Sequence, residues 1–145
     1  MKPEIDQILG VTAGQLAMEI APLLPASYSQ STTGLLSLLL GFCAAEYERG
    51  ADIRAAENAD MRNLFATLGG SVKDTILKAK LSEAASGRDT SLKISDLNAA
   101  NMALKTLLIA LQEDCEVRGD AKAQAAIWKV LQASADRRLV KLPGM

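Results

Sequence analysis

The acidic side chains of a leucine-rich segment are the residues of this sequence best suited to chemistry. Glu46 and Glu57 are eleven residues apart, which is about three turns of an α-helix. That spacing places both carboxylates on one face of the helix. Carboxylates that project into a helical bundle are able to bind a metal ion. One hypothesis is therefore a carboxylate-metal bundle enzyme that uses Glu46 and Glu57.

The composition removes most other catalytic systems. The sequence contains no histidine, which excludes Ser-His-Asp and Cys-His nucleophiles, histidine metal ligands and the Glu-x-x-His di-iron pattern. Cys43 and Cys115 are far apart in apolar surroundings and are expected to be reduced thiols that pack as small hydrophobic side chains. The segment LGGSVK (68–73) matches neither a Walker loop nor a dinucleotide fingerprint. We expect a protein that is not an enzyme and has no cofactor.

The composition also indicates the elements that must position these acids. Hydrophobic residues make up 49% of the chain, but aromatic residues only 3%, and alanine and leucine dominate. Alanine and leucine favour helix over strand. We predict an all-α fold: an antiparallel bundle of four to five helices, with one long central helix, in a single domain spanning residues 1–145.

Apolar periodicity, prolines and glycines place the helices. Pro22 and Pro25 end the first helix, Gly69 and Gly70 end the second, and Gly119 ends the fourth. The predicted helices span about residues 3–22, 34–68, 72–85, 96–118 and 121–139. The residues expected to cap them are Ser29, Ser31 or Thr32 for the second helix, Ser71 with Asp74 for the third, Ser95 for the fourth and Asp120 for the fifth.

Two glutamates fall on the apolar face of the second helix. At 100° per residue, one sector contains Leu35, Leu39, Phe42, Ile53, Leu64 and Leu68, and Glu46 and Glu57 lie in its middle, with Asp60 at its edge and Arg49 just outside it. A buried carboxylate without a partner costs several kcal/mol. Four interpretations follow: this part of the helix projects into water, the glutamates pair with a base such as Arg118, Arg137 or Lys105, they meet a second copy across a dimer seam, or they bind a metal.

Three further residues are candidates for contacts with other helices or partners. The segments 56–68 and 99–111 align without gaps, which makes Asn58 equivalent to Asn101. Both amides lie at the border of their apolar stripes, where each either bonds a neighbouring helix or is a plain boundary amide. Trp128 either anchors a partner or covers the edge of the core. A duplicated helical hairpin and simple likeness of composition both explain the repeated pattern.

The charge distribution bears on partners and location. Residues 1–60 contain three basic and eight acidic side chains, whereas residues 61–145 contain thirteen basic and nine acidic ones. Such opposite balances, −5 and +4, suggest that the two parts pack together or that copies associate. Neither part has the concentrated basic face of a nucleic-acid binder. The longest apolar run, 34–45, is too short to span a membrane, and we expect a cytoplasmic protein.

These observations favour a non-enzymatic helical protein-interaction module, such as an adaptor, an assembly factor or an export-chaperone-like bundle. We expect it to form a homodimer or to bind a protein partner. The predicted interaction residues are Glu46, Arg49, Ile53, Glu57, Asn58, Asn101 and Trp128. The alternatives are a bundle that binds a small apolar ligand, favoured by the alanine- and leucine-rich interior, and the carboxylate-metal enzyme.

Overall fold

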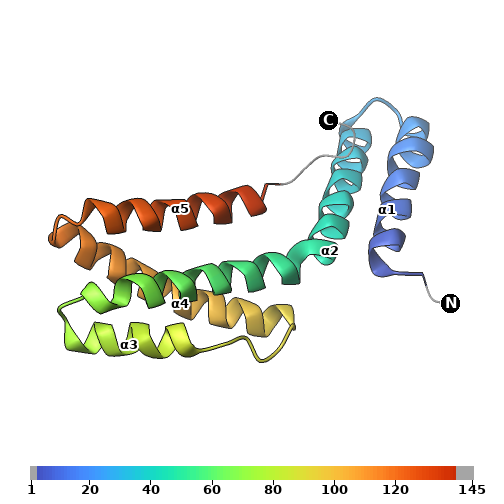
Figure 1. The fold of residues 1–145 in the computed structure, drawn as a ribbon. Helices are drawn as coiled ribbons and strands as arrows, with labels where there is room; N and C mark the ends of the chain where they lie inside the picture. Colours follow the sequence, from blue (N-terminus) through green and yellow to red (C-terminus); the bar gives the residue numbers. More distant parts are fainter. Residues whose placement is uncertain (1–2, 140–145) are drawn as a thin grey trace. The chain divides into compact units, whose positions relative to one another are not determined.

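A computed structural model describes residues 3–139, and every regular element in that range is helical (Figure 1). The predicted all-α class and the long central helix are confirmed. The central helix, α2, contains 41 residues. The elements are α1 (Ile5–Gln15), η1 (Leu16–Ile20), η2 (Ala21–Leu23), α2 (Tyr28–Leu68), η3 (Gly69–Ser71), α3 (Thr75–Ser86), α4 (Ile94–Val117) and α5 (Ala121–Arg137).

The described residues divide into two compact units, 3–50 and 51–139, and α2 contributes residues to both. We call them the hairpin unit and the four-helix unit. The expectation that the whole chain is one domain stays a prediction. None of the described helices combines the length and the apolar character needed to cross a membrane.

The hairpin unit pairs α1 with the first half of α2. The Ser37 hydroxyl donates to the carbonyl of Ala13 at 2.7 Å, and the Gln30 amide donates to the carbonyl of Ala21 at 3.2 Å. These two bonds fix an antiparallel register. Between the helices the chain passes through a π-helical turn, η1, and a 3-10 turn, η2. Pro22 explains this change of pitch, because it has no N–H to donate to a carbonyl one α-helical turn earlier.

The second helix begins at Tyr28, earlier than the predicted start at about residue 34. The Ser31 amide already donates to the carbonyl of Ser27 at 3.3 Å. The Thr32 and Thr33 hydroxyls donate to carbonyls four residues earlier, at 2.8 and 2.9 Å. Polar side chains here bond back to the helix that contains them rather than forming a connection. The capping prediction for Ser29, Ser31 and Thr32 is therefore wrong, because all three lie inside α2.

The four-helix unit consists of residues 51–68 of α2 followed by α3, α4 and α5, and consecutive helices run antiparallel (Figure 1). The turn between α2 and α3 is tight at Gly69, where glycine lets the backbone approach Leu81 closely. A Cβ at this position would lie 3.3 Å from the Cβ of Leu81. Asp74 then caps α3, which begins at Thr75, by accepting from the amides of Ile76 and Leu77 at 2.8 and 3.2 Å, so the predicted capping box that starts the helix at Ser71 is wrong. Ser71 takes no part in this cap and donates to the carbonyl of Leu68.

Replacing Asp74 with alanine should lower the free energy of unfolding by about 1 kcal/mol, because two amides of the first turn of α3 lose their acceptor. Asp74→Ser is the matched control, since serine also caps helices. Urea unfolding followed by circular dichroism measures both variants. Equal losses for alanine and serine would show that the cap does not stabilise α3.

The helices α4 and α5 differ at their N-termini, because only α5 has a side-chain cap. Gly119 ends α4 with a φ of +66°, a left-handed conformation that glycine adopts without strain. Asp120 then caps α5, as predicted, by accepting from the amide of Ala123 at 3.0 Å. The Ser95 cap is wrong: α4 begins at Ile94, and Lys93 occupies the cap position without a side-chain bond to the helix.

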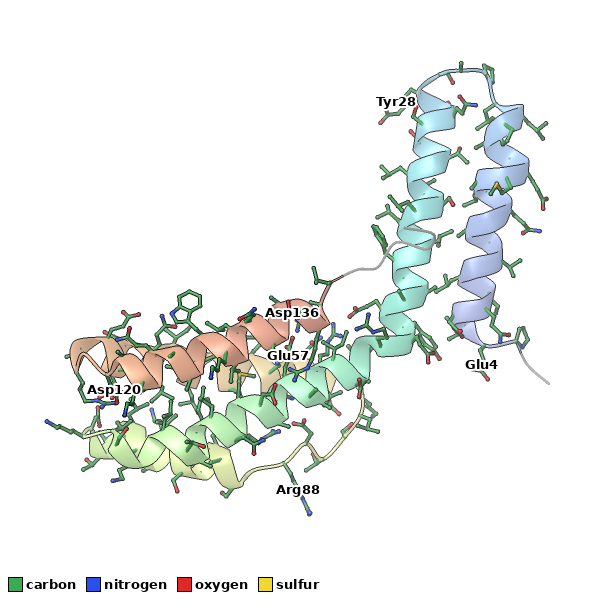
Figure 2. All side chains as sticks on the ribbon, turned by 45° about the horizontal axis from the view of Figure 1, so that its top comes forward. Glu4, Tyr28, Glu57, Arg88, Asp120 and Asp136 are labelled. Atoms are coloured by element: carbon green, nitrogen blue, oxygen red, sulfur yellow. The ribbon has the colours of Figure 1, made fainter. Side chains whose placement is uncertain are left out.

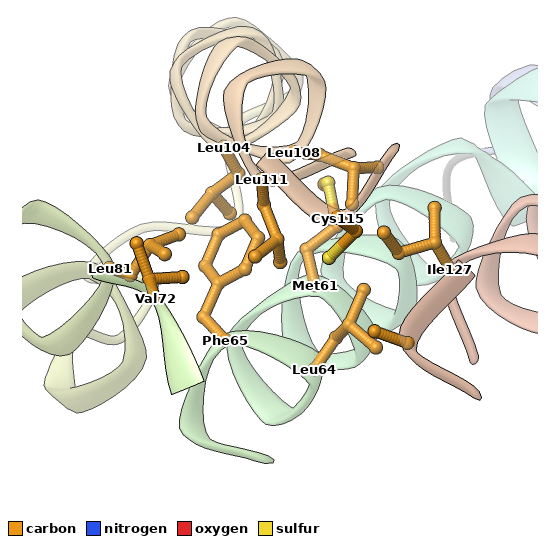
Figure 3. Packing of buried hydrophobic residues seen from close by; sticks show 11 residues of the cluster. Met61, Leu64, Phe65, Val72, Leu81, Leu104, Leu108, Leu111, Cys115 and Ile127 are labelled. Carbon is orange, nitrogen blue, oxygen red and sulfur yellow. The ribbon is translucent and has the colours of Figure 1, made fainter. Parts of the chain in front are cut away.

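The apolar core lies within the four-helix unit (Figure 3). At the centre of this core, the side chain of Phe65 on α2 is 1% exposed, and those of Leu111 and Cys115 on α4 are completely buried. The buried cluster consists of Met61, Leu64, Phe65, Val72, Leu81, Leu104, Leu108, Leu111, Cys115, Ala123 and Ile127. Among the described residues, every buried apolar side chain belongs to residues 51–139. The hairpin unit has none.

Candidate functional site

A buried carboxylate in the four-helix unit collects hydrogen bonds from two other helices. The side chain of Glu57, on α2, is 2% exposed and lies between α2 and α5 (Figure 2). Its Oε1 accepts from Ser134 Oγ at 2.7 Å and from Arg138 Nε at 2.5 Å. Its Oε2 accepts from Arg138 Nη2 at 2.7 Å and from Asn101 Nδ2 at 3.1 Å. The guanidinium of Arg138 therefore binds the carboxylate in the bidentate geometry that gives the strongest ion pairs.

The α-helical period explains how α5 supplies two donors to one carboxylate. Ser134 and Arg138 are four residues apart, so they lie on the same face at the end of α5. Asn101 approaches from α4, and Lys105, one turn further along the same helix, places its Nζ 4.0 Å from Glu57 Oε2. One side chain of α2 is thus tied to both α4 and α5.

These donors keep Glu57 ionised. Burial alone raises the pKa of this carboxyl, but the hydrogen bonds from Arg138 and Ser134 and the positive charges of Arg138 and Lys105 outweigh it. The result is a pKa lowered from 4.5 to about 2. A carboxylate with this pKa and with both oxygens occupied is a poor general base near neutral pH.

The network continues through two buried asparagines. Asn101 Nδ2 also donates to Asn58 Oδ1 at 2.9 Å. Asn58, completely buried, donates to the Asp89 carboxylate at 3.1 and 3.2 Å and to the carbonyl of Leu97 at 3.3 Å. Arg62 Nη2 closes the chain of contacts by donating to Asp89 Oδ1 at 2.7 Å. We call the residues from Arg138 through Glu57, Asn101, Asn58 and Asp89 to Arg62 the polar network.

The far end of the polar network is also charge-paired. Burial raises the pKa of Asp89, but the bonds from Arg62 and Asn58 and the charge of Arg62 act more strongly and lower it below its usual range. Asp89 lies in the segment between α3 and α4, so the network also holds this connection against α2.

The predicted interaction residues separate into two groups. Glu57, Asn58 and Asn101 belong to the polar network, and Ile53 is buried one turn before Glu57. The other three residues are exposed: Glu46 and Arg49 in the hairpin unit, and Trp128, with 64% exposure, on α5. The expectation that the two asparagines are plain boundary amides is wrong, because both are buried and hydrogen-bonded.

Of the four interpretations of the glutamates, ion pairing describes Glu57. Lys105 is a predicted partner, but the main partner is Arg138. The other two predicted bases pair elsewhere: Arg118 with Asp114 and Asp120, and Arg137 with Asp60. Glu46 differs, because the stripe of Leu35, Leu39 and Phe42 that contains it lies on the opposite side of α2 from Ser37, which faces α1. The prediction that Glu46 points into the core is wrong.

The equivalent segments 56–68 and 99–111 lie against each other. Asn58 bonds to Asn101, its counterpart at an offset of 43 residues, and Arg54 Nε bonds to Asn98 Oδ1 at 2.6 Å with an offset of 44. Nearly constant offsets show that these parts of α2 and α4 run in the same direction. The repeated sequence pattern thus produces a paired contact at the centre of the polar network.

Four residues of this site are absent from the sequence predictions: Arg62, Asp89 and Arg138 of the polar network, and Ser134, which donates to Glu57. The spacing of Ser134 and Arg138 shows that they share a helix face, but not that this face meets Glu57. Asp89 lies in a loop, SGRDTS, without periodicity. These contacts join residues that are 27 to 81 positions apart in the sequence, and the packing of the four-helix unit brings them together.

The space beside Glu57 does not suggest a ligand site. A cavity of about 20 Å³ lies between α2, α4 and α5, lined by residues that include Glu57, Met61 and Leu131. That volume corresponds to about one water molecule. No group of three acidic or cysteine side chains placed to hold a metal occurs in the described part of the chain.

The chain matches no protein-family model, no curated protein and no solved structure. Its function must therefore be inferred from its own residues and geometry.

The low pKa of Glu57 predicts a specific acid sensitivity. Its folded-state pKa of about 2 lies below its ordinary 4.5, so its stabilising contribution is complete above pH 4.5 and is lost as the pH falls towards 2. Between pH 7 and pH 3 the free energy of unfolding should fall by on the order of 2 kcal/mol more in the natural protein than in Glu57→Gln. Urea unfolding at both pH values measures this difference, and identical acid sensitivity of the two proteins would contradict the pairing.

Proposed function

We propose that this chain is a non-enzymatic helical protein-interaction module that self-associates through its hairpin unit. The observation that carries this proposal is the exposure of apolar side chains in residues 3–50. Twelve large ones are 42–87% exposed: Ile5, Ile8, Val11, Met18, Ile20, Leu23, Tyr28, Leu35, Leu36, Leu38, Leu39 and Tyr47. Apolar surface this extensive is typical of an interaction site.

The charge pattern supports the same conclusion. Between Asp6 and Glu46 the only charged residue is Glu19. An exposed helix normally has charged residues on its solvent side, whereas the centre of a protein interface is depleted of them. Helices α1 and the first half of α2 therefore have the composition of buried helices although their side chains are exposed.

The energetics also favour a partner. Full burial of a large apolar side chain contributes about 1.5–3 kcal/mol, so covering a half-exposed one contributes about 1 kcal/mol. Twelve such side chains supply on the order of 10 kcal/mol per copy. Two copies together supply about 20 kcal/mol at most, against an estimated cost of association of about 4–15 kcal/mol.

The four-helix unit supports a non-enzymatic role. The most perturbed carboxyl, Glu57, has both oxygens bonded to donors and lies beside a cavity of about 20 Å³. A catalytic acid or base needs a reactant within hydrogen-bond reach. The polar network instead joins α2, α4, α5 and the segment before α4, which suits a rigid scaffold that presents the hairpin unit.

Replacing Leu39 with glutamate should reduce self-association at least tenfold, because the variant places a charge in the apolar face of α2. Leu92→Glu is the matched control: it makes the same change at a leucine that is 75% exposed in the segment before α4. Size-exclusion chromatography with light scattering measures the mass of each variant. If Leu39→Glu associates as strongly as Leu92→Glu, the hairpin unit is not the interface.

A further inference from the structure

We infer that the occupant of the exposed leucine face of α2 is a second copy of this chain, and that the two hairpin units pack head to tail. This inference rests on the proposed function and adds the partner, the stoichiometry and the orientation. The leucine face is defined by Tyr28, Leu35, Leu39, Phe42 and Glu46. At 100° per residue these five side chains fall within a sector of roughly 60°, on the side of α2 opposite to Ser37.

The exposed apolar area of α2 in the hairpin unit is suited to a reversible dimer. Six of the twelve exposed apolar side chains belong to α2, and at about half accessible each they present on the order of 300 Å² of apolar surface per copy. A stable interface buries roughly 800 Å² per partner, of which a little more than half is apolar. A second copy packed against α2 therefore buries an apolar area near the low end of specific interfaces, where association is reversible.

The order of side chains along the face makes it complementary to itself when reversed. Ser37 lies at the middle of residues 28–46. When two copies pack head to tail about this point, each residue faces the residue of the second copy that lies equally far on the other side of position 37, so the two residue numbers add up to about 74. Leu35 then faces Leu39 of the second copy. Tyr28, whose side chain is 87% exposed, faces the second copy's Glu46, to which its hydroxyl is able to donate. In a parallel pair, each residue instead faces the same residue of the second copy.

The distribution of acids selects the same orientation. The bonds Ser37–Ala13 and Gln30–Ala21 join residues whose numbers add up to 50 and 51, which places Glu4 and Asp6 at the same end of the hairpin as Glu46 and Glu48. In a parallel pair, the acids of both copies would meet at one end. Head-to-tail packing separates them by roughly 27 Å along the helix, which exceeds the screening length of about 8–10 Å.

The same acids argue against a lipid surface as the occupant. Cytoplasmic membrane surfaces are negatively charged and attract clusters of lysine and arginine. Residues 3–50 contain five acidic side chains and one basic side chain, Arg49. A hairpin unit with this charge balance is repelled by anionic lipids. A second copy packed head to tail does not meet such repulsion, because its acidic end lies at the opposite end of the pair.

Dipolar EPR distances between spin labels on the full-length chain test the orientation. Cys43 is exposed and Cys115 is buried, so the natural protein is labelled at Cys43. Tyr28→Cys and Leu36→Cys, each with Cys43→Ser, place single labels at the turn and near the middle of the hairpin. Head-to-tail packing predicts axial separations that rise with distance from residue 37: roughly 3 Å at position 36, 18 Å at position 43 and 27 Å at position 28.

Each outcome of this experiment decides the inference. A dimer whose label distances increase in the order 36, 43, 28 supports it. A dimer or larger assembly with similar distances at all three positions overturns the head-to-tail arrangement but leaves self-association through the hairpin unit intact. A monomer overturns both the inference that a second copy covers the leucine face and the proposed function. This holds whether or not added phosphatidylcholine vesicles protect the amides of the hairpin unit from hydrogen exchange.

Discussion

The Glu57→Ala variant should lose about 1–3 kcal/mol of unfolding free energy, because it removes the acceptor for three donors at once. Asn101, Ser134 and Arg138 all donate to this carboxylate. The buried amide of Asn101 loses this acceptor in the interior, whereas the side chain of Arg138 is 44% exposed and regains water. Lys105, which lies 4.0 Å from Glu57, also loses its counter-charge.

Urea unfolding followed by circular dichroism and by the fluorescence of Trp128 measures this loss, and Trp128 reports on the four-helix unit because it belongs to α5. Glu113→Ala is the matched control, since Glu113 is an exposed glutamate of α4, and its effect should stay within about 0.5 kcal/mol. If both substitutions have the same small effect, the polar network does not hold the helices together.

Truncating Leu111 to alanine should cost about 2–5 kcal/mol, towards the upper end, because its side chain is completely buried in the core. The neighbouring apolar residue Ile109 is 68% exposed on the same helix. Ile109→Ala removes similar atoms two residues away and should change the free energy of unfolding by less than about 0.5 kcal/mol.

The pair of variants tests the face that α4 turns to the core. The same unfolding measurement applies to both, so differences in helix propensity largely cancel. A larger loss for Ile109→Ala than for Leu111→Ala would mean that α4 is rotated relative to the packing described above.

The sequence predicts the parts of this fold that depend on local chemistry. The glycines at 69, 70 and 119 lie where α2 and α4 end, and Asp120 caps the helix that follows Gly119. These signals act within one helical turn. The start of α2 is missed for a related reason: serine and threonine favour caps, but at Thr32 and Thr33 they bond back to carbonyls four residues earlier, which extends the helix.

The candidate site is only partly predictable. Helical periodicity identifies Glu57 as a carboxylate on an apolar face, and the repeated segments identify Asn58 and Asn101 as equivalent. Periodicity alone gives Glu46 the same status, yet it is exposed in the hairpin unit. What separates the two glutamates is the position of Arg138, which is 81 residues from Glu57 in the sequence. No local pattern determines such a contact.

Sedimentation equilibrium of the full-length chain over a range of concentrations is the most direct test of self-association through the hairpin unit. The chain has a mass of 15.4 kDa. We predict a mass twice that value which decreases towards the single-chain mass on dilution, and a weaker association for Leu39→Glu than for Leu92→Glu. A mass of one chain at every concentration would contradict the proposal that copies of this protein cover each other's exposed leucines.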